Sequence, residues 1–305
     1  MKKTLLLALV LVSLFAVRVS AVDLSYNLKV GSSYVQSTKT TFNMGMNVLG
    51  QTMNIGTTVS SHMTYTVKSV KDTCYEIDVR YDSIGVAMNG LTGNQSLNSG
   101  ISTAQGKVSD MVNQLVNKTF QLTMSKKGKA VEIKNYEALF SALESTNQSS
   151  QDANNQISTQ LKQNFSKEAF LSNMEANVSF FPAKSVNKGE SWTCVNKMMT
   201  SGMPVESTTI YTLTNVTASQ YIITGVSTVK TDMGSGTPMS IQGVTANIDI
   251  KGGITYEMAL NKTTGWLNQL TGKIDMDANV NVGGGEAQGQ SLSMKITGNI
   301  ESNDR

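Results

Sequence analysis

Apolar and polar residues alternate along much of this chain with the two-residue period of half-buried strands. The period is clearest in three runs, whose apolar members are Tyr75, Ile77, Val79 and Tyr81; Tyr256, Met258 and Leu260; and Ile274, Met276, Ala278, Val280 and Val282. Asp and Asn fill the intervening positions of the last run, between 275 and 281. One face of that strand is therefore expected to be solvent-exposed, which is typical of antiparallel sheets.

A long segment of this pattern occurs twice. The second copy keeps the residue type and spacing of the first at Val59/Val205, Tyr65/Tyr211, Val67/Leu213, Val70/Val216, Tyr75/Tyr221 and Ile77/Ile223. Upstream, residues 31–34 (GSSY) match 189–192 (GESW), and downstream 120–128 (FQLTMSKKG) matches 256–265 (YEMALNKTTG). The repeat is too long for a solenoid and indicates a duplicated β unit.

The stretch between the copies changes to a helical period. Tyr136, Leu139, Phe140 and Leu143 follow the spacing of one amphipathic helix, and Ile157, Leu161, Phe165, Ala169 and Phe170 follow that of another. Ser166 is placed to cap a helical turn. A connector that packs on an open sheet face and a partly disordered polar linker both remain open for this stretch.

The sequence thus predicts a mainly β fold with a helical insert (α+β). Duplicated antiparallel units would form half-barrels or sandwiches, with helices between the copies. The predicted organisation is a signal peptide at 1–21, a first β repeat at 22–134, a helical insert at 135–182 and a second β repeat at 183–305.

The N-terminus has the three parts of a cleaved secretory signal. Lys2 and Lys3 precede an apolar stretch at 5–17, and Val19-Ser20-Ala21 provides a small-residue cleavage site. The apolar stretch is shorter than the roughly 20 residues that cross a bilayer, and no later segment reaches that length without charge. We therefore expect a periplasmic or extracellular protein with no transmembrane segment after cleavage; an uncleaved N-terminal anchor is the alternative.

Charge gives no sign of a nucleic-acid partner. The formal net charge is +3, charged residues make up 15% of the chain, and their distribution is scattered. The densest basic cluster, Lys126, Lys127 and Lys129, falls where the repeat predicts a hairpin turn, so a solvated turn explains it.

The chain has two cysteines, Cys74 and Cys194. In an exported protein such a pair predicts a disulfide, here between the two copies. Two buried free thiols are the alternative, because the cysteines do not occupy equivalent positions of the repeat.

Catalytic and metal-binding signatures are weak. His62 is the only histidine, and the chain has no nucleophile elbow, phosphate-binding Gly-Lys-Thr loop or calcium-loop spacing. A pair of carboxylates from distant strands would leave no local motif. We predict a protein that is not an enzyme and has neither a cofactor nor a metal site.

Methionine is the unusual entry in the composition, with 17 residues. Thioether clusters can hold Cu(I). Seven of the methionines, however, stand at alternating strand positions, which favours an adaptable core or an apolar pocket; they are Met44, Met46, Met63, Met124, Met258, Met276 and Met294. The candidate ligand-binding residues are Met44, Met46, Met124, Met258 and Met276.

Several short motifs carry a family resemblance. Tyr26, Leu28, Gly31 and Tyr34 begin the mature chain, Phe180-Phe181-Pro182 ends the helical stretch, and Val186 with 189–192 (GESW) begins the second copy. This order resembles a family of uncharacterised exported proteins of Gram-negative bacteria, which defines no functional residues. In plan, the chain is also similar to the lipoprotein-carrier half-barrels of the periplasm, which hold acyl chains between sheet and helices.

Two functional hypotheses follow. In the first, the sheets enclose an apolar cavity that binds a lipid or another hydrophobic small molecule. In the second, closed sandwiches without a cavity serve as a structural or interaction module for an envelope protein. The alternating methionines favour the first hypothesis, and the absence of a converging polar site motivates the second.

Overall fold

The structure, a computed structural model, describes residues 21–48, 51–89, 95–98, 115–136, 139, 166–200, 203–231, 239–241, 244–282 and 291–304. Within these ranges lie thirteen strands: β1 (Ser33–Val48), β2 (Gln51–Lys71), β3 (Cys74–Asn89), β4 (Gln95–Asn98), β5 (Thr119–Ser125), β6 (Ala130–Lys134), β7 (Ser191–Thr200), β8 (Met203–Val216), β9 (Gln220–Thr231), β10 (Met239–Ile241), β11 (Val244–Asn261), β12 (Leu267–Val282) and β13 (Ser291–Asn303). Helix α5 spans Lys167–Val178.

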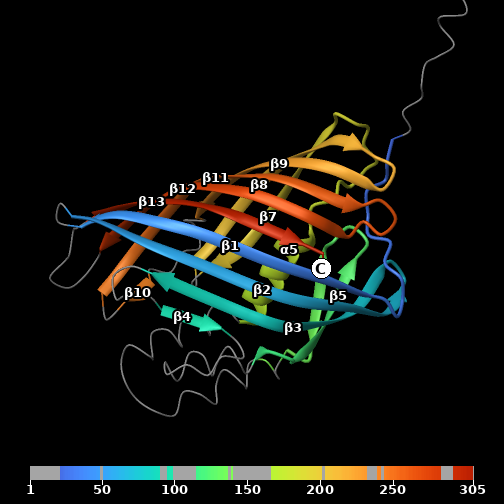
Figure 1. The fold of residues 1–305 in the computed structure, drawn as a ribbon, viewed down its shortest axis with the longest axis horizontal. Helices are drawn as coiled ribbons and strands as arrows, with labels where there is room; N and C mark the ends of the chain where they lie inside the picture. Colours follow the sequence, from blue (N-terminus) through green and yellow to red (C-terminus); the bar gives the residue numbers. More distant parts are fainter. Residues whose placement is uncertain are drawn as a thin grey trace, which may run out of the picture.

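The strands form one antiparallel sheet. Its order is β6-β5-β3-β2-β1-β13-β12-β11-β9-β8-β7, and the short strands β4 and β10 pair with β3 and β11. Figure 1 shows that the sheet curls, so that β1 to β3 lie on one side of α5 and β7 to β9 on the other. The predicted mainly β fold with a helical insert is confirmed. The copies share one open sheet and do not form two separate ones.

The strand order explains the duplication. Strands β1, β2, β3, β5 and β6 of the first copy, the first arm, correspond to β7, β8, β9, β11 and β12 of the second copy, the second arm. The two arms follow each other in the same direction through the sheet, and β13 lies between them. β13 pairs with β1 on one side and with β12 on the other. The C-terminal strand therefore joins the two copies.

Local hydrogen bonds repeat with the sequence. The Gly31 amide donates to the Val67 carbonyl (2.8 Å), and the equivalent Gly189 amide donates to the Leu213 carbonyl (2.7 Å). The β2–β3 register also shifts after Val67, and the β8–β9 register shifts after Leu213. The duplication thus extends to a turn and a β-bulge, which re-aim the chain in the same way in both arms.

Helix α5 lies where the two edges of the sheet approach each other, since it contacts both β6 and β7. Ser166 caps it as predicted, because its hydroxyl accepts from the Ala169 amide (3.2 Å). The Asn173 side chain protects the edge strand β7: its amide donates to the Met199 carbonyl and its oxygen accepts from the Met199 amide, both at 3.2 Å. These bonds satisfy backbone groups that an edge strand otherwise leaves open.

The predicted helices of the insert are described only in part. Ala169 and Phe170 lie in α5 and are buried, as are Tyr136 and Leu139 farther upstream. Phe140 and Leu143 lie outside the described residues, as does the predicted helical segment 157–165.

The hydrophobic core fills one end of the curled sheet, which we call the closed end. Both arms contribute to it, and the extended segment 22–31, the segment 178–186 and α5 pack there as well. Its fully buried side chains include Val67, Ile77, Val79, Phe120, Leu122, Leu213, Ile223 and Leu260. Burial of such a side chain contributes roughly 1.5–3 kcal/mol to stability. The two copies therefore share one core.

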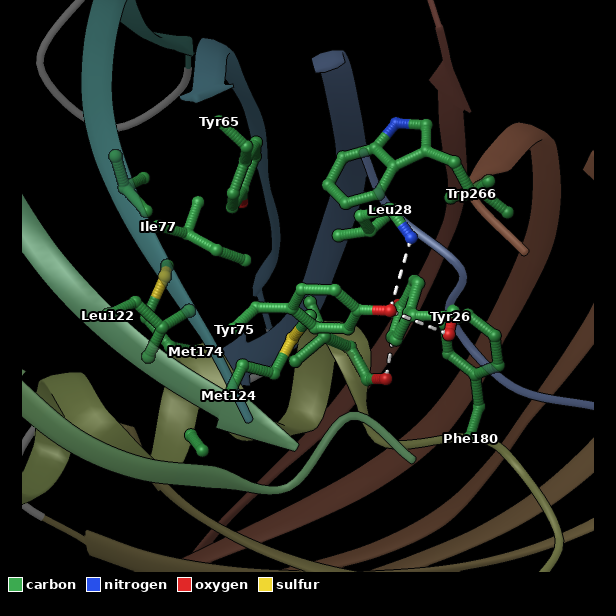
Figure 2. Close-up of a cluster of buried hydrophobic side chains, with 14 of the residues drawn as sticks. Tyr26, Leu28, Tyr65, Tyr75, Ile77, Leu122, Met124, Met174, Phe180 and Trp266 are labelled. Atoms are coloured by element: carbon green, nitrogen blue, oxygen red, sulfur yellow. Dashed lines mark hydrogen bonds between the residues drawn. The ribbon is translucent and has the colours of Figure 1, made fainter. Parts of the chain in front are cut away.

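Tyrosine hydroxyls satisfy buried backbone groups in this core, as Figure 2 shows. The Tyr75 hydroxyl donates to the Tyr26 carbonyl (3.0 Å) and accepts from the Leu28 amide (3.2 Å). The Tyr26 hydroxyl donates to the Val178 carbonyl (3.2 Å). The extended N-terminal segment is therefore held without being part of the sheet.

The predicted disulfide is not formed, and Cys74 and Cys194 are both free. Cys74 precedes the core residue Tyr75 on β3 and therefore faces away from the core. Cys194 faces inward, where its thiol lies 3.9 Å from the Phe181 carbonyl. Opposite faces of the sheet separate the two sulfur atoms, so the sequence-based prediction of a bridge between the copies is wrong.

Candidate functional site

The long strands continue well beyond the core. Strand β2 has 21 residues, but its members of the core cluster begin only at Met63. The face that carries the core, which we call the inner face, continues along the earlier half of the strand at alternate residues. We call this second half of the sheet the open end.

Apolar side chains from five adjacent strands line the inner face of the open end. All of them are half-buried, and none belongs to the core cluster. This inner apolar patch consists of Met44 and Met46 on β1, Met53 and Ile55 on β2, Leu292, Met294 and Ile296 on β13, Met276 and Val280 on β12, and Ile248 and Ile250 on β11.

Cross-strand pairing makes the patch continuous. Met44 lies opposite Ile55 on one side and Ile296 on the other, and Ile296 in turn lies opposite Met276. Directly opposite residues have Cβ atoms about 4.5–5.5 Å apart. Half-buried methionines next to isoleucines form a deformable apolar surface.

The structure divides the five predicted methionines into two groups. Met44, Met46 and Met276 lie together in the inner apolar patch. Met124 and Met258 lie in the core at the closed end, where only 1% and 2% of their surfaces are exposed. Core packing therefore accounts for Met124 and Met258, and they are not available to a ligand. Sequence reasoning did not single out Ile55 on β2 or Ile296 on β13, although Ile296 alternates with polar residues along β13.

The opposite, outer face is polar. The charged residues of β1, β2, β12 and β13 alternate with inner-face residues and lie on this side: Lys39, Lys68, Lys71, Lys273, Asp275, Asp277, Lys295 and Glu301. On β11, Asp249 and Lys251 alternate with Ile248 and Ile250. Lys295 forms ion pairs with Asp275 and, at 3.3 Å, with Asp277. The described inner face of these strands therefore carries no charged side chain.

Hydroxyl groups lie between the core and the inner apolar patch. Thr38 lies opposite Ser61 on one side and Ser302 on the other. The Ser302 hydroxyl is 3.0 Å from that of Thr38 and accepts from the Gln36 amide at 3.3 Å. Thr57 lies four residues from Ser61 on β2, closer to the patch and opposite Phe42 of β1. We call Thr38, Ser61, Ser302 and Thr57 the hydroxyl band.

Thr57 differs from the other members of the hydroxyl band. It lies on the inner face of β2, only 8% exposed, and its hydroxyl has no hydrogen-bond partner in the described structure. A buried hydroxyl without a partner destabilises a protein by about 1–3 kcal/mol. Such a group in a native structure calls for an explanation, and a bound ligand is one.

The second arm also carries polar side chains at the equivalent positions of its inner face. Asn196 and Ser207 are cross-strand partners at the positions that correspond to Thr38 and Ser61. The Ser207 hydroxyl is 2.6 Å from that of Ser227, which also accepts from Thr209 at 3.1 Å. These groups satisfy one another. Aligning the two repeats would have revealed the shared polar positions.

Burial also shifts the pKa values of titratable groups near the inner face. It raises the pKa of Tyr256 to about 12 and raises the pKa of the Cys194 thiol. Both groups therefore stay protonated and neutral near pH 7. The inner face thus stays neutral at these positions as well.

The lone histidine lies on the outer face. The His62 Nδ1 atom is 2.6 Å from the Ser37 hydroxyl. Among the described residues, no Asp or Glu bonds to this ring, so a Ser-His-Asp arrangement is not assembled there. The described residues also contain no group of three His, Cys, Asp or Glu side chains that could hold a metal ion.

Fold and site together define an open, curled antiparallel sheet whose strands β1, β2 and β11 to β13 have a polar outer face and, as far as it is described, an uncharged, partly apolar inner face. The chain belongs to a family of unknown function (DUF6263), whose model matches residues 72–267. This agrees with the resemblance to an uncharacterised family. No match was found among curated proteins. Across the described ranges, no helix has the length and apolar character needed to cross a membrane.

Among solved structures, the chain is similar to lipovitellin, in a structure described as showing lipid–protein interactions in that protein. The TM-score is 0.50 with 7% identity, and the match covers 92% of this chain and 25% of that one. The chain thus spans about a quarter of that relative. It also matches the COG4313 outer membrane channel from Pseudomonas putida F1, at a TM-score of 0.26 and 6% identity over 94% of this chain and 100% of that one. The lipovitellin likeness shows the fold alone.

Proposed function

We propose that the protein binds a lipid or another hydrophobic ligand on the inner apolar patch, and that it is an exported binding protein rather than an enzyme. The observation that carries this proposal is the half-buried apolar surface on five adjacent strands, outside the core cluster. Large apolar surfaces of this kind mark binding sites in soluble proteins.

Two further observations support the proposal. The strands of the open end extend far beyond the shared core, so the fold maintains a length of sheet that core packing does not require. The structural neighbour lipovitellin is described in terms of its lipid–protein interactions. The predicted signal peptide supports the proposed export.

The proposal is tested by exchanging one side chain on each face of β13. Ile296→Asn places an amide in the middle of the inner apolar patch, whereas Thr297→Asn places the same amide on the outer face. We expect the first variant to bind a fluorescent fatty-acid probe at least about tenfold more weakly. The second should bind like the parent protein.

Native mass spectrometry provides the independent readout. The protein should carry an apolar adduct after purification, and extraction with organic solvent should remove it. Melting temperatures from circular dichroism show whether both variants fold. A folded protein with neither an adduct nor probe uptake would remove the ligand hypothesis and leave the envelope-partner alternative.

A further inference from the structure

The inner face suggests what kind of lipid it would take. This inference rests on the proposed function and deepens it. An ionic headgroup that is taken out of water needs a charged partner or several hydrogen bonds to offset the loss of hydration. The described inner face of β1, β2, β12 and β13 provides no charged side chain, because the charged residues of these strands face outward.

The same face does offer neutral polar groups in one place. Thr38, Ser61 and Ser302 cross β2, β1 and β13 on the side of the core, and Thr57 lies between them and the inner apolar patch, next to Ile55 on the same face of β2. Thr57 Oγ1 is buried and has no partner within the described structure, so it is available to donate a hydrogen bond. Ser61, the inner-face residue four positions along β2, provides a second hydroxyl on the same side.

We propose that the inner face binds an uncharged lipid with hydroxyl or ester oxygens and disfavours lipids with ionic headgroups. Its acyl chains lie on the inner apolar patch and its polar part lies on the hydroxyl band. Thr57 Oγ1 donates to an ester or hydroxyl oxygen of the ligand. This hydrogen bond gives the buried hydroxyl the partner that it otherwise lacks.

The first test compares two lipids with the same acyl chains. Dioleoylglycerol is uncharged, and dioleoylphosphatidylglycerol adds an anionic headgroup. Each is supplied from detergent micelles, and bound lipid is measured by native mass spectrometry of the full-length mature protein. We expect dioleoylglycerol to bind at least about tenfold more tightly. Equal or tighter binding of the anionic lipid would overturn the inference but support the proposed function, whereas binding of neither would refute both.

A second test addresses the hydroxyl band through Thr57→Val, which replaces a hydroxyl by a methyl group of similar size. We expect this variant to bind dioleoylglycerol several-fold more weakly. We also expect its melting temperature without ligand to rise, since the unpartnered buried hydroxyl is gone. Thr58→Val, on the outer face of the same strand, is the control. If Thr57→Val left the affinity unchanged, the hydroxyl band would not be the site of the polar part.

Discussion

At the residue scale, two pairs of equivalent glycines show how the duplicated unit uses the same residue for different reasons. Gly31 and Gly189 have positive φ angles of +80° and +89°, and a Cβ atom would meet nothing there. Gly128 and Gly265 also have positive φ, at +86° and +70°, but a Cβ atom would collide with the Val178 and Ser25 carbonyl oxygens. The first pair needs glycine for its backbone conformation, and the second also for close packing.

This difference predicts unequal effects of the same substitution. Gly189→Ala should lower the free energy of unfolding by roughly 1–2 kcal/mol, because only the left-handed backbone is strained. Gly265→Ala should lower it by about 3 kcal/mol or more, because segment 22–31 must also move. Urea unfolding of both variants measures the difference. Equal losses would show that the packing of Ser25 against this turn contributes nothing.

At the element scale, the sequence predicted the strands better than their arrangement. The alternation around Tyr75 and Tyr256 and the repeat of Tyr65 at Tyr211 identified strands that the structure contains. The position of β13 between the copies had no local signal, because pairing between distant strands depends on the whole chain. The same limit explains the wrong disulfide prediction: spacing alone does not show that Cys74 and Cys194 face opposite ways.

The candidate site shows a similar division. Alternation placed Met44, Met46 and Met276 on one face of their strands, but Met124 and Met258 share that pattern and lie in the core. Whether an inward-facing residue is covered depends on α5 and on segment 22–31, which pack only at the closed end. Periodicity therefore identifies the inner face but not the boundary between core and open surface.

Helix α5 and strand β7 give a prediction at this scale. Asn173→Ala removes both hydrogen bonds to the Met199 backbone, so we expect a loss of about 1–3 kcal/mol in unfolding free energy. The exposed edge should also promote self-association, which size-exclusion chromatography detects. Asn177→Ala, at an exposed position of the same helix, is the matched control and should change stability by less than about 0.5 kcal/mol. Indistinguishable variants would show that α5 does not protect the edge.

At the scale of the whole molecule, the two copies form one cooperative folding unit. β13 pairs with a strand of each copy, and the core at the closed end takes side chains from both. Tyr65 and Tyr81 come from the first arm, Tyr211 from the second, and Tyr26 from the N-terminal segment. Neither arm can lose its share of the core without exposing that of the other, so we expect the copies to unfold together.

Unfolding at alkaline pH tests whether the two copies unfold together, because buried tyrosines lie in both arms. Burial raises the pKa of Tyr26, Tyr65, Tyr81 and Tyr211 above the ordinary value near 10. Below about pH 10 the folded and unfolded states are both protonated, and the full stability is present. Above that pH the unfolded chain loses phenolic protons that the folded chain retains. Stability therefore falls as the pH rises toward the raised folded pKa values, by roughly 1.4 kcal/mol per pH unit for each buried tyrosine.

We expect a single unfolding transition between about pH 10 and 12, with ellipticity and tyrosinate absorbance changing together. Because the core is shared, tyrosines of both arms should ionise in the same step. Tyr81→Phe removes one of the linked protons, so the free energy of unfolding should fall less steeply with pH, by about 1.4 kcal/mol per unit. Two separate transitions would instead show that the arms unfold independently. Ionisation of the buried Tyr26, Tyr65, Tyr81 and Tyr211 without loss of ellipticity would show that the closed end admits water while folded.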